Sequence, residues 1–263
     1  MKLSILIPVY NSEKILPTLI KRILKYIKIS QEQFEIILVN DCSRDLSWEI
    51  IKRLSNRNKM IKGINLKKNY GQHYAIFTGL KYTKGDYIIC MDDDMQHDPI
   101  FINKIIDELK KNNDTCYVKY IGRKHSIIKI FISWLNNIVS SFLMTKSVKI
   151  YTSSFKGFKK NIKKIIIKYS SNYVFLDYPI IRFSKKISVI NVNHKKRFRG
   201  QTNYKLKQLI TLWSNMIFVL DTKKISLRSF FIMFLRLFFI KFLKNYIDLN
   251  KNKKIIIRSK TFK

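Results

Sequence analysis

The sequence predicts an α/β fold with a mostly parallel sheet. In its first half, short apolar runs alternate with longer segments of helical periodicity, an arrangement typical of β-α-β units. The 263 residues are enough for one α/β domain with a sizeable core and a short appendage, and the hydrophobic fraction of 46% is ordinary for a globular protein. We therefore expect a single folded catalytic or binding domain.

The first half divides into four strands and three helices. The strands are expected at 3–9, Phe34–Val39, Met60–Leu66 and Tyr87–Met91. The helices are expected at Glu13–Lys28, Asp45–Ser55 and Gln72–Tyr82. The first strand resembles a signal peptide only superficially, because Pro8 closes its short apolar run and no small-residue cleavage site follows.

The second half predicts more elements of the same kinds, followed by a change of pattern. In chain order we expect a helix, a strand, a long apolar helix and two strands, at Ile100–Lys111, Thr115–Ile121, Ser126–Leu143, Tyr151–Phe158 and Lys186–Asn193. From Tyr204 onward the sequence becomes helical and rich in large apolar residues. We accordingly expect a catalytic domain at 1–203, interfacial helices at 204–247 and a basic, mobile tail at 248–263.

The charge balance points to a polyanionic neighbour. Lys and Arg number 52 against 17 for Asp and Glu, a formal net charge of +35. Nucleic acid, anionic lipid and a phosphate-rich substrate all fit such a field. The three cysteines are far apart and odd in number, which argues against a disulfide framework and a structural zinc site.

Two apolar segments near the end are candidate membrane spans. The segment 209–220 is too short, since a span needs ~20 apolar residues. Ile225–Tyr246 is long enough but contains two Arg and two Lys, which are costly within a bilayer. Its amphipathic character is weak because these cations surround the helix. We expect it to lie at the membrane interface, with an ordinary core helix as the alternative.

Three polar clusters follow predicted strands and should meet at one edge of the sheet, where open α/β sheets bind ligands. They are Tyr10-Asn11, Asn40–Ser43 and Asp92–Asp94. Adjacent carboxylates repel one another, and a divalent cation on a diphosphate would relieve that repulsion. Asp92 and Asp94 would flank the cation and Gln96 would add a neutral oxygen, although a solvated acidic turn fits as well.

The order of the motifs resembles family 2 glycosyltransferases, which have the GT-A fold of nucleotide-diphospho-sugar transferases, a Rossmann-like, mostly parallel sheet. Over about residues 3–221 the motifs are Ile7–Asn11, Val39–Asp45, Asn69–His73, Gly85-Asp86 and Asp92–Pro99. Within that family the chain is most similar to polyprenyl-phosphate sugar transferases, of the dolichol-phosphate mannose and undecaprenyl-phosphate formamido-arabinose types.

This resemblance implies roles on the donor side. Pro8, Tyr10 and Asp41 would hold the base and ribose of the nucleotide. Asp92 and Asp93 would lie against the donor. The resemblance assigns Mg²⁺ or Mn²⁺ to Asp92, Asp94 and Gln96, and the shape of the donor loop to Asn69 and Gly71. A packing role for Tyr10 and a plain turn at Asn69 are the open alternatives.

The resemblance also implies phosphate contacts. The segment His194–Tyr204 is similar to a family loop in which Arg197, Gly200 and Thr202 would contact the acceptor or donor phosphates. An arginine there can bind phosphate bidentately, and glycine lets the backbone approach closely. Arg123 and Lys124 would add a second contact. A solvated basic loop is the alternative.

The chain departs from the family pattern in several places. Ser12 stands where the family has Glu, Ile150 lies near the place of an Asp, and Lys156 replaces an Arg. The relatives carry two transmembrane helices after the interfacial ones, and we expect none here. The expected protein is therefore peripheral, on the cytoplasmic side of an anionic membrane.

We expect an inverting transfer of a sugar from a nucleotide-sugar donor to a polyprenyl phosphate, which needs little deprotonation. Asp94 and Arg197 would be its catalytic residues. The first alternative acceptor is a hydroxyl of a lipid-linked saccharide, for which Asp177 would be the base. A basic nucleic-acid-binding protein or a membrane scaffold is another alternative, but no nucleic-acid-binding motif supports the former.

Overall fold

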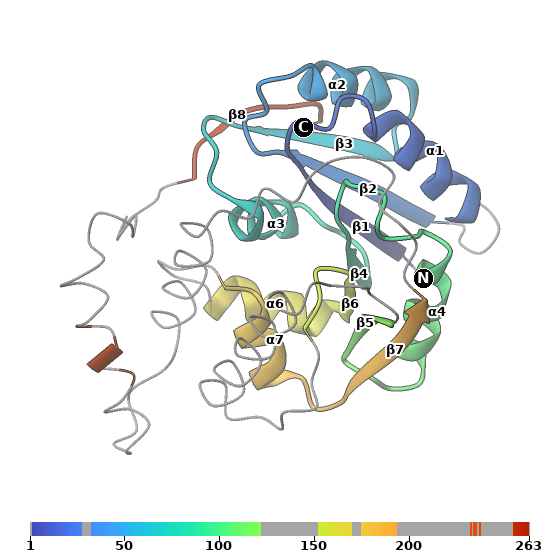
Figure 1. Ribbon diagram of the computed structural model, residues 1–263, viewed down its shortest axis with the longest axis vertical. Helices are drawn as coiled ribbons and strands as arrows, with labels where there is room; N and C mark the ends of the chain where they lie inside the picture. Colours follow the sequence, from blue (N-terminus) through green and yellow to red (C-terminus); the bar gives the residue numbers. More distant parts are fainter. Residues whose placement is uncertain are drawn as a thin grey trace.

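The computed structural model describes residues 2–27, 33–121, 152–169, 175–193 and 255–262, together with four positions of the segment 225–246. These residues form one eight-stranded sheet in the order β7-β5-β6-β4-β1-β2-β3-β8 (Figure 1). Its strands are β1 Lys2–Val9, β2 Gln33–Asn40, β3 Ile61–Leu66, β4 Tyr87–Cys90, β5 Thr115–Ile121, β6 Lys156–Lys159, β7 Ile187–Asn193 and β8 Ile257–Lys260.

The strand directions confirm a mostly parallel sheet. β4, β1, β2 and β3 are parallel neighbours, and so are β5 and β7. β6 runs antiparallel to both β4 and β5, and β8 runs antiparallel to β3. The parallel group puts the carboxyl ends of four strands at one edge of the sheet.

Helices cover both faces of this sheet (Figure 1). The described helices are α1 Leu16–Ile27, α2 Ser47–Arg57, α3 Gln72–Leu80, α4 Phe101–Lys110, α6 Lys160–Tyr169 and α7 Asp177–Phe183. Buried residues of α1, α2 and α4 pack on one face, and those of α3 and α6 pack on the other. The sheet is therefore the middle of three layers.

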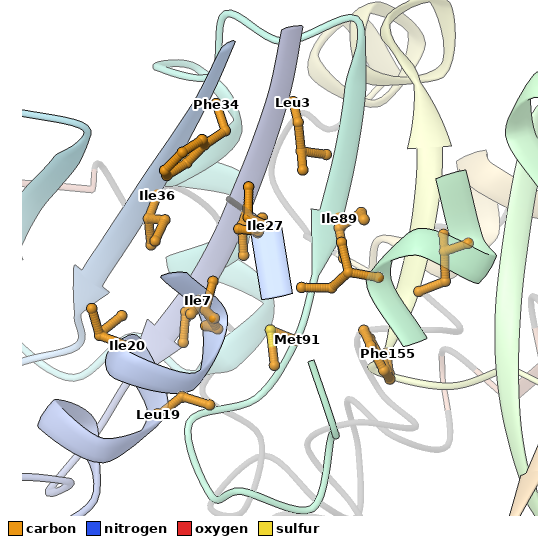
Figure 2. Packing of buried hydrophobic residues seen from close by; sticks show 14 of the residues in the cluster. Leu3, Ile7, Leu19, Ile20, Ile27, Phe34, Ile36, Ile89, Met91 and Phe155 are labelled. Atoms are coloured by element: carbon orange, nitrogen blue, oxygen red, sulfur yellow. The ribbon is translucent and has the colours of Figure 1, made fainter. Parts of the chain in front are cut away.

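The core explains why the early strands are continuous apolar runs. In β1, Leu3, Ile5 and Ile7 face the α1 side, whereas Leu6 faces α3. Figure 2 shows Leu3 and Ile7 with α1 residues such as Leu19 on that side of the strands. A strand that is buried on both faces needs apolar residues at nearly every position, which removes the alternation typical of exposed sheets.

Most expected elements are present with small shifts of their ends. The first helix begins at Leu16 instead of Glu13, after a turn in which the Ile15 amide donates to the Ser12 carbonyl. The strand expected at Tyr151–Phe158 is instead β6, which starts at Lys156. The helix expected at Ser126–Leu143 lies outside the described residues.

The expectation of a mobile C-terminal tail is wrong for residues 255–262. β8 pairs with the edge strand β3, and Thr261 Oγ1 accepts a hydrogen bond of 2.7 Å from the Gly63 amide. The strand alternates between half-buried and exposed positions, with Arg258 and Lys260 exposed. An edge strand offers unpaired backbone groups, and this alternating segment covers them.

None of the described helices is long and apolar enough to cross a membrane. The segment Ile225–Tyr246 falls outside the described residues except for Ile232, Phe234, Leu235 and Leu237. Its place at a membrane interface, like the division into three regions, stays a prediction.

A buried carboxylate ties the amino-terminal ends of the strands together. Glu35 of β2 accepts hydrogen bonds from Ser4 Oγ at 2.6 Å, from Lys62 Nζ at 2.6 Å and from the Lys84 amide. Burial raises the pKa of Glu35, but the hydrogen bonds from Lys62, Ser4 and Lys84 outweigh it and hold the pKa below its ordinary value. The ionised form therefore stabilises the fold.

We predict that Glu35→Gln lowers the free energy of unfolding at pH 7 by about 2 kcal/mol, the usual size for hydrogen bonds to a charged group. Because the folded pKa is depressed, this stability is present above the unfolded pKa and is lost as the pH falls through the folded pKa. Urea denaturation at pH 7 and pH 3 measures the difference, which should shrink at pH 3. Glu49→Gln, at an exposed ion pair with Lys52, is the control and should change little. A difference of the same size at both pH values would contradict this role.

Candidate active site

The polar clusters expected at the strand ends do meet at one edge of the sheet. The parallel register sets Val9 of β1 beside Asn40 of β2, and Leu6 beside Cys90 of β4. Beyond β1, the Tyr10 amide donates to Asp93 Oδ2 at 3.0 Å, and the Asp41 amide donates to the Val9 carbonyl at 2.9 Å. Three loops that are far apart in sequence therefore form one rim.

Asparagine and serine side chains shape the loops after β1 and β2. The Asn11 amide donates to Ser43 Oγ at 3.0 Å, and Asn11 Oδ1 accepts from the Arg44 amide at 2.8 Å. Asn40 Oδ1 accepts from Ser43 Oγ at 2.5 Å. With these loops held together, Pro8 is buried, whereas Tyr10 remains 45% exposed at the rim. Tyr10 is thus available to contact a ligand.

Asp41 holds the loop that precedes α3. Its Oδ1 accepts from the Tyr70 amide at 2.8 Å, and its Oδ2 accepts from the Gly71 amide at 2.7 Å. Gly71 has φ +93°, a backbone conformation that residues with a side chain rarely adopt. Asn69 is exposed beside it. Because each carboxylate oxygen can accept more than one hydrogen bond, these two bonds leave Asp41 with acceptor capacity for a nucleotide. The contact itself stays a prediction.

The three consecutive aspartates have different partners. Asp92 accepts from Gln72 Nε2 on one oxygen and from Ser154 Oγ, at 2.7 Å, on the other. Asp94 Oδ1 accepts from the Gln96 amide at 3.1 Å. The side chains of these residues therefore do not form a uniform acidic surface.

Asp93, the middle aspartate, is turned toward β1. Besides the Tyr10 amide, its Oδ2 accepts a short hydrogen bond from Ser12 Oγ. Burial raises the pKa of Asp93 to about 6, with smaller contributions from Asp92 and Asp94, while the Ser12 and Tyr10 hydrogen bonds oppose the shift. Asp93 thus joins the β1 and β4 loops.

His97 belongs to the site although the sequence alone indicates no role for it. It lies within the motif Asp92–Pro99. Its Nδ1 accepts from the Asp92 amide at 2.8 Å, so the neutral ring carries its proton on Nε2. That nitrogen lies 3.5 Å from Ser154 Oγ and 3.7 Å from Asp92 Oδ2. The ring is stacked on Phe155 and Tyr120. His97 therefore fixes the start of the acidic loop.

The residues fit a divalent cation that a substrate would help to bind. Among the described residues, no group of three or more His, Cys, Asp and Glu side chains is arranged to hold a metal ion. Mg²⁺ is commonly held by only one or two carboxylates together with substrate phosphates and waters. Asp92 and Asp94 provide two carboxylates, and the side chain of Gln96 provides an amide oxygen. Oxygens of a bound diphosphate would complete the coordination of the cation, and this ligand set stays a prediction.

Asp177 begins α7 in a buried ion pair. Its Oδ1 accepts from Tyr117 Oη at 2.8 Å and from Lys156 Nζ in a closer contact. The Lys156 side chain is only 3% exposed. Burial, with Asp177 as the next cause, raises the pKa of Tyr117 well above its ordinary value, so the phenol stays a donor. The carboxylate that would serve as a base for a hydroxyl acceptor is therefore already paired with a cation and hydrogen-bonded to a phenol.

His73 is buried and interacts electrostatically with Asp177 and Lys156 of this ion pair and with Asp92 of the acidic loop. Burial lowers the pKa of His73 to about 4, partly against the charges of Asp177 and Asp92. Its ring packs on Phe175, with centroids 5.2 Å apart. A neutral imidazole of this kind adds no positive charge to the site.

The expected phosphate contacts cannot be placed. Arg123, Lys124, Arg197, Gly200 and Thr202 all lie outside the described residues. Their roles stay predictions that rest on the sequence motifs alone.

Comparisons with known proteins agree with this geometry. The family described as "Glycosyl transferase family 2" matches residues 4–166. Undecaprenyl-phosphate 4-deoxy-4-formamido-L-arabinose transferases of Yersinia pestis (strain Pestoides F) and Yersinia enterocolitica are 31% identical to this chain over 229 residues, which are 87% of this chain and 70% of each relative.

Solved structures show the same fold. Glucosyl-3-phosphoglycerate synthase from Mycobacterium tuberculosis in complex with uridine diphosphate has a TM-score of 0.61 at 14% identity, covering 83% of this chain and 79% of its own. S. aureus TarS 1–349 in complex with UDP-GlcNAc has a TM-score of 0.56 at 20% identity, covering 90% of this chain and 72% of its own. The expected GT-A fold is confirmed.

We predict that Lys156→Met lowers the free energy of unfolding by about 3–5 kcal/mol, because it leaves the buried Asp177 carboxylate unpaired. Lys156→Arg keeps the charge and should be less destabilising. Urea denaturation at pH 7 measures both variants. Lys111→Met, at the exposed ion pair with Glu108, is the matched control and should leave stability nearly unchanged. Equal effects at positions 156 and 111 would show that the buried pair does not contribute as argued.

Proposed function

This chain belongs to glycosyltransferase family 2, and on that premise we propose that it transfers a sugar from a nucleotide-diphosphate donor to a polyprenyl phosphate with inversion at the anomeric carbon. The Yersinia relatives are named as undecaprenyl-phosphate transferases, which supports a lipid phosphate as acceptor. The reaction would take place on the cytoplasmic face of the membrane.

The pairing of Asp177 is the observation that carries the choice of acceptor. A sugar hydroxyl needs a base that removes its proton, whereas a phosphate is already anionic near neutral pH. Asp177 is the carboxylate that the sequence offers as this base, and its Oδ1 accepts hydrogen bonds from Lys156 and Tyr117. Because Lys156 and Tyr117 already engage this oxygen, Asp177 is less available to take a proton from a hydroxyl, which supports the phosphate acceptor.

The rim supports the donor half of the proposal. Pro8, Tyr10 and Asp41 would hold the base and ribose, with the exposed Tyr10 ring available for contact. Asp92, Asp94 and Gln96 would hold Mg²⁺ or Mn²⁺. The metal, when bound, supplies positive charge that stabilises the leaving diphosphate. Asp93 would act indirectly, since it holds the Tyr10 amide.

The acceptor half rests on sequence and charge. Arg197, Gly200 and Thr202, with Arg123 and Lys124, would contact phosphates of the acceptor or donor. The net charge of +35 supports attraction to an anionic membrane surface, where such an acceptor lies. Arg197 would bring the acceptor phosphate toward the anomeric carbon.

We predict that uridine diphosphate binds in the presence of Mn²⁺ and that Asp94→Ala weakens this binding by at least about tenfold, the lower end of the effect of removing a group that supports a metal. Isothermal titration with and without Mn²⁺ measures the change. Asp107→Ala is the control because Asp107 is an exposed aspartate of α4. Equal affinity with and without Mn²⁺ would rule out the metal.

We also predict that undecaprenyl phosphate accepts the sugar and that Asp177→Asn keeps turnover, per folded molecule, within about tenfold of wild type, whereas loss of a general base costs typically 10²–10⁴-fold. Turnover of several nucleotide-sugars is measured with undecaprenyl phosphate, with an undecaprenyl-linked saccharide and with water alone. Transfer only to the saccharide, abolished in Asp177→Asn, would favour the hydroxyl acceptor instead.

A further inference from the structure

The C-terminal strand reaches the loop that Asp41 holds. β8 is antiparallel to β3, and the pairing continues past the strand end, where the Lys67 amide donates to the Ile256 carbonyl at 2.9 Å. In return, the Ile256 amide donates to the phenol oxygen of Tyr70 at 3.0 Å. Ile256 therefore contacts both ends of the segment Lys67–Tyr70.

The same segment is held from the other side by the β2 loop. Tyr70 and Gly71 donate their amides to Asp41, and Cys42 Sγ donates to the Lys67 carbonyl at 3.5 Å. Residue 67 is thus hydrogen-bonded through its amide to Ile256, the residue before β8, and through its carbonyl to the β2 loop. Tyr70 likewise accepts a hydrogen bond from the Ile256 amide at its phenol oxygen and donates its own amide to Asp41.

Side-chain packing holds both partners of the hydrogen bond between Ile256 and Tyr70 in place. The Tyr70 ring is only 6% exposed and belongs to the core under α3. Ile255 and Ile257, on either side of Ile256, pack against the same core. The Ile256 side chain is 45% exposed, so this residue contributes mainly through its backbone.

We propose that Ile256 and Tyr70 are positioning residues for the nucleotide: β8 holds the segment Lys67–Gly71 so that Asp41 and Gly71 keep the shape of the donor side of the rim. This inference rests on the proposed function for its ligand, a nucleoside diphosphate. Ile256, far from the donor motifs in sequence, is then part of the apparatus that positions the donor. Neither Ile256 nor Tyr70 needs to touch the nucleotide.

Tyr70→Phe tests the proposal in the full-length protein, since it removes the acceptor for the Ile256 amide and keeps the ring in the core. Hydrogen exchange at the Tyr70 and Gly71 amides, measured without ligand, should become roughly three- to tenfold faster, as expected for one lost hydrogen bond. Uridine diphosphate with Mn²⁺ should bind more weakly by a similar factor. In turnover assays the donor KM should rise while kcat stays near wild type, because the reacting groups are unchanged. Ile256→Pro removes the same hydrogen bond from the β8 side and should reproduce these effects.

Thr261→Val is the matched control. It removes the hydroxyl that accepts from the Gly63 amide and donates to Ser55 at the other end of the β8 pairing. It should lower stability without changing exchange at residue 71 or the nucleotide affinity. A merely structural role for β8 would make all three variants alike.

The outcomes separate the inference from the proposed function. Wild-type exchange and affinity in Tyr70→Phe, with nucleotide binding intact in the wild type, would overturn the inference alone. A wild-type protein that binds no uridine or other nucleoside diphosphate would contradict the proposed function, and the role of β8 in donor binding would fail with it.

Discussion

The position of β1 between β2 and β4 is the constraint on which the candidate active site depends. Both neighbours are parallel to β1, so all three strands end at the same edge. The buried residues of β1 face opposite sides in alternation, and a slip of one residue would exchange the two faces. The pairing of Ser4 with Glu35 adds a polar contact at the other end of the strand. Burial of β1 thus fixes where Tyr10, Asp41 and Asp92 meet.

This constraint explains which features the sequence could predict. Strands buried on both faces are visible as apolar runs, and the polar residues that follow them must lie at a common edge if the strands are parallel. The rim of Tyr10, Asp41 and Asp92–Asp94 follows from these two facts and needs no side-chain geometry. The family motifs then added the expected ligands of that rim.

Features that depend on distant partners could not be predicted in this way. Asp177 pairs with Lys156 and Tyr117, which lie 21 and 60 positions away in the sequence. β8 is a four-residue strand within a basic segment, and only the free edge of β3 gives it a partner. His97 was visible in a motif, but its bond to the Asp92 amide depends on the turn at Met95, whose φ is +64°. In each case the deciding contact is tertiary.

Two of the departures from the family pattern, Ser12 and Lys156, have partners that bear on the electrostatics of the site, whereas Ile150 lies outside the described residues. Ser12 gives a hydroxyl donor to Asp93 where the pattern has a carboxylate, and Lys156 keeps a positive charge against Asp177 where the pattern has arginine. The negative charges of Asp93 and Asp177 are therefore compensated by nearby hydrogen-bond donors. The surface cations cannot replace these contacts, because salt screens exposed charges beyond roughly 8 Å at physiological ionic strength. On the proposed function, their excess would draw a polyanionic substrate or membrane toward the rim, where Asp92 and Asp94 would bind the cation.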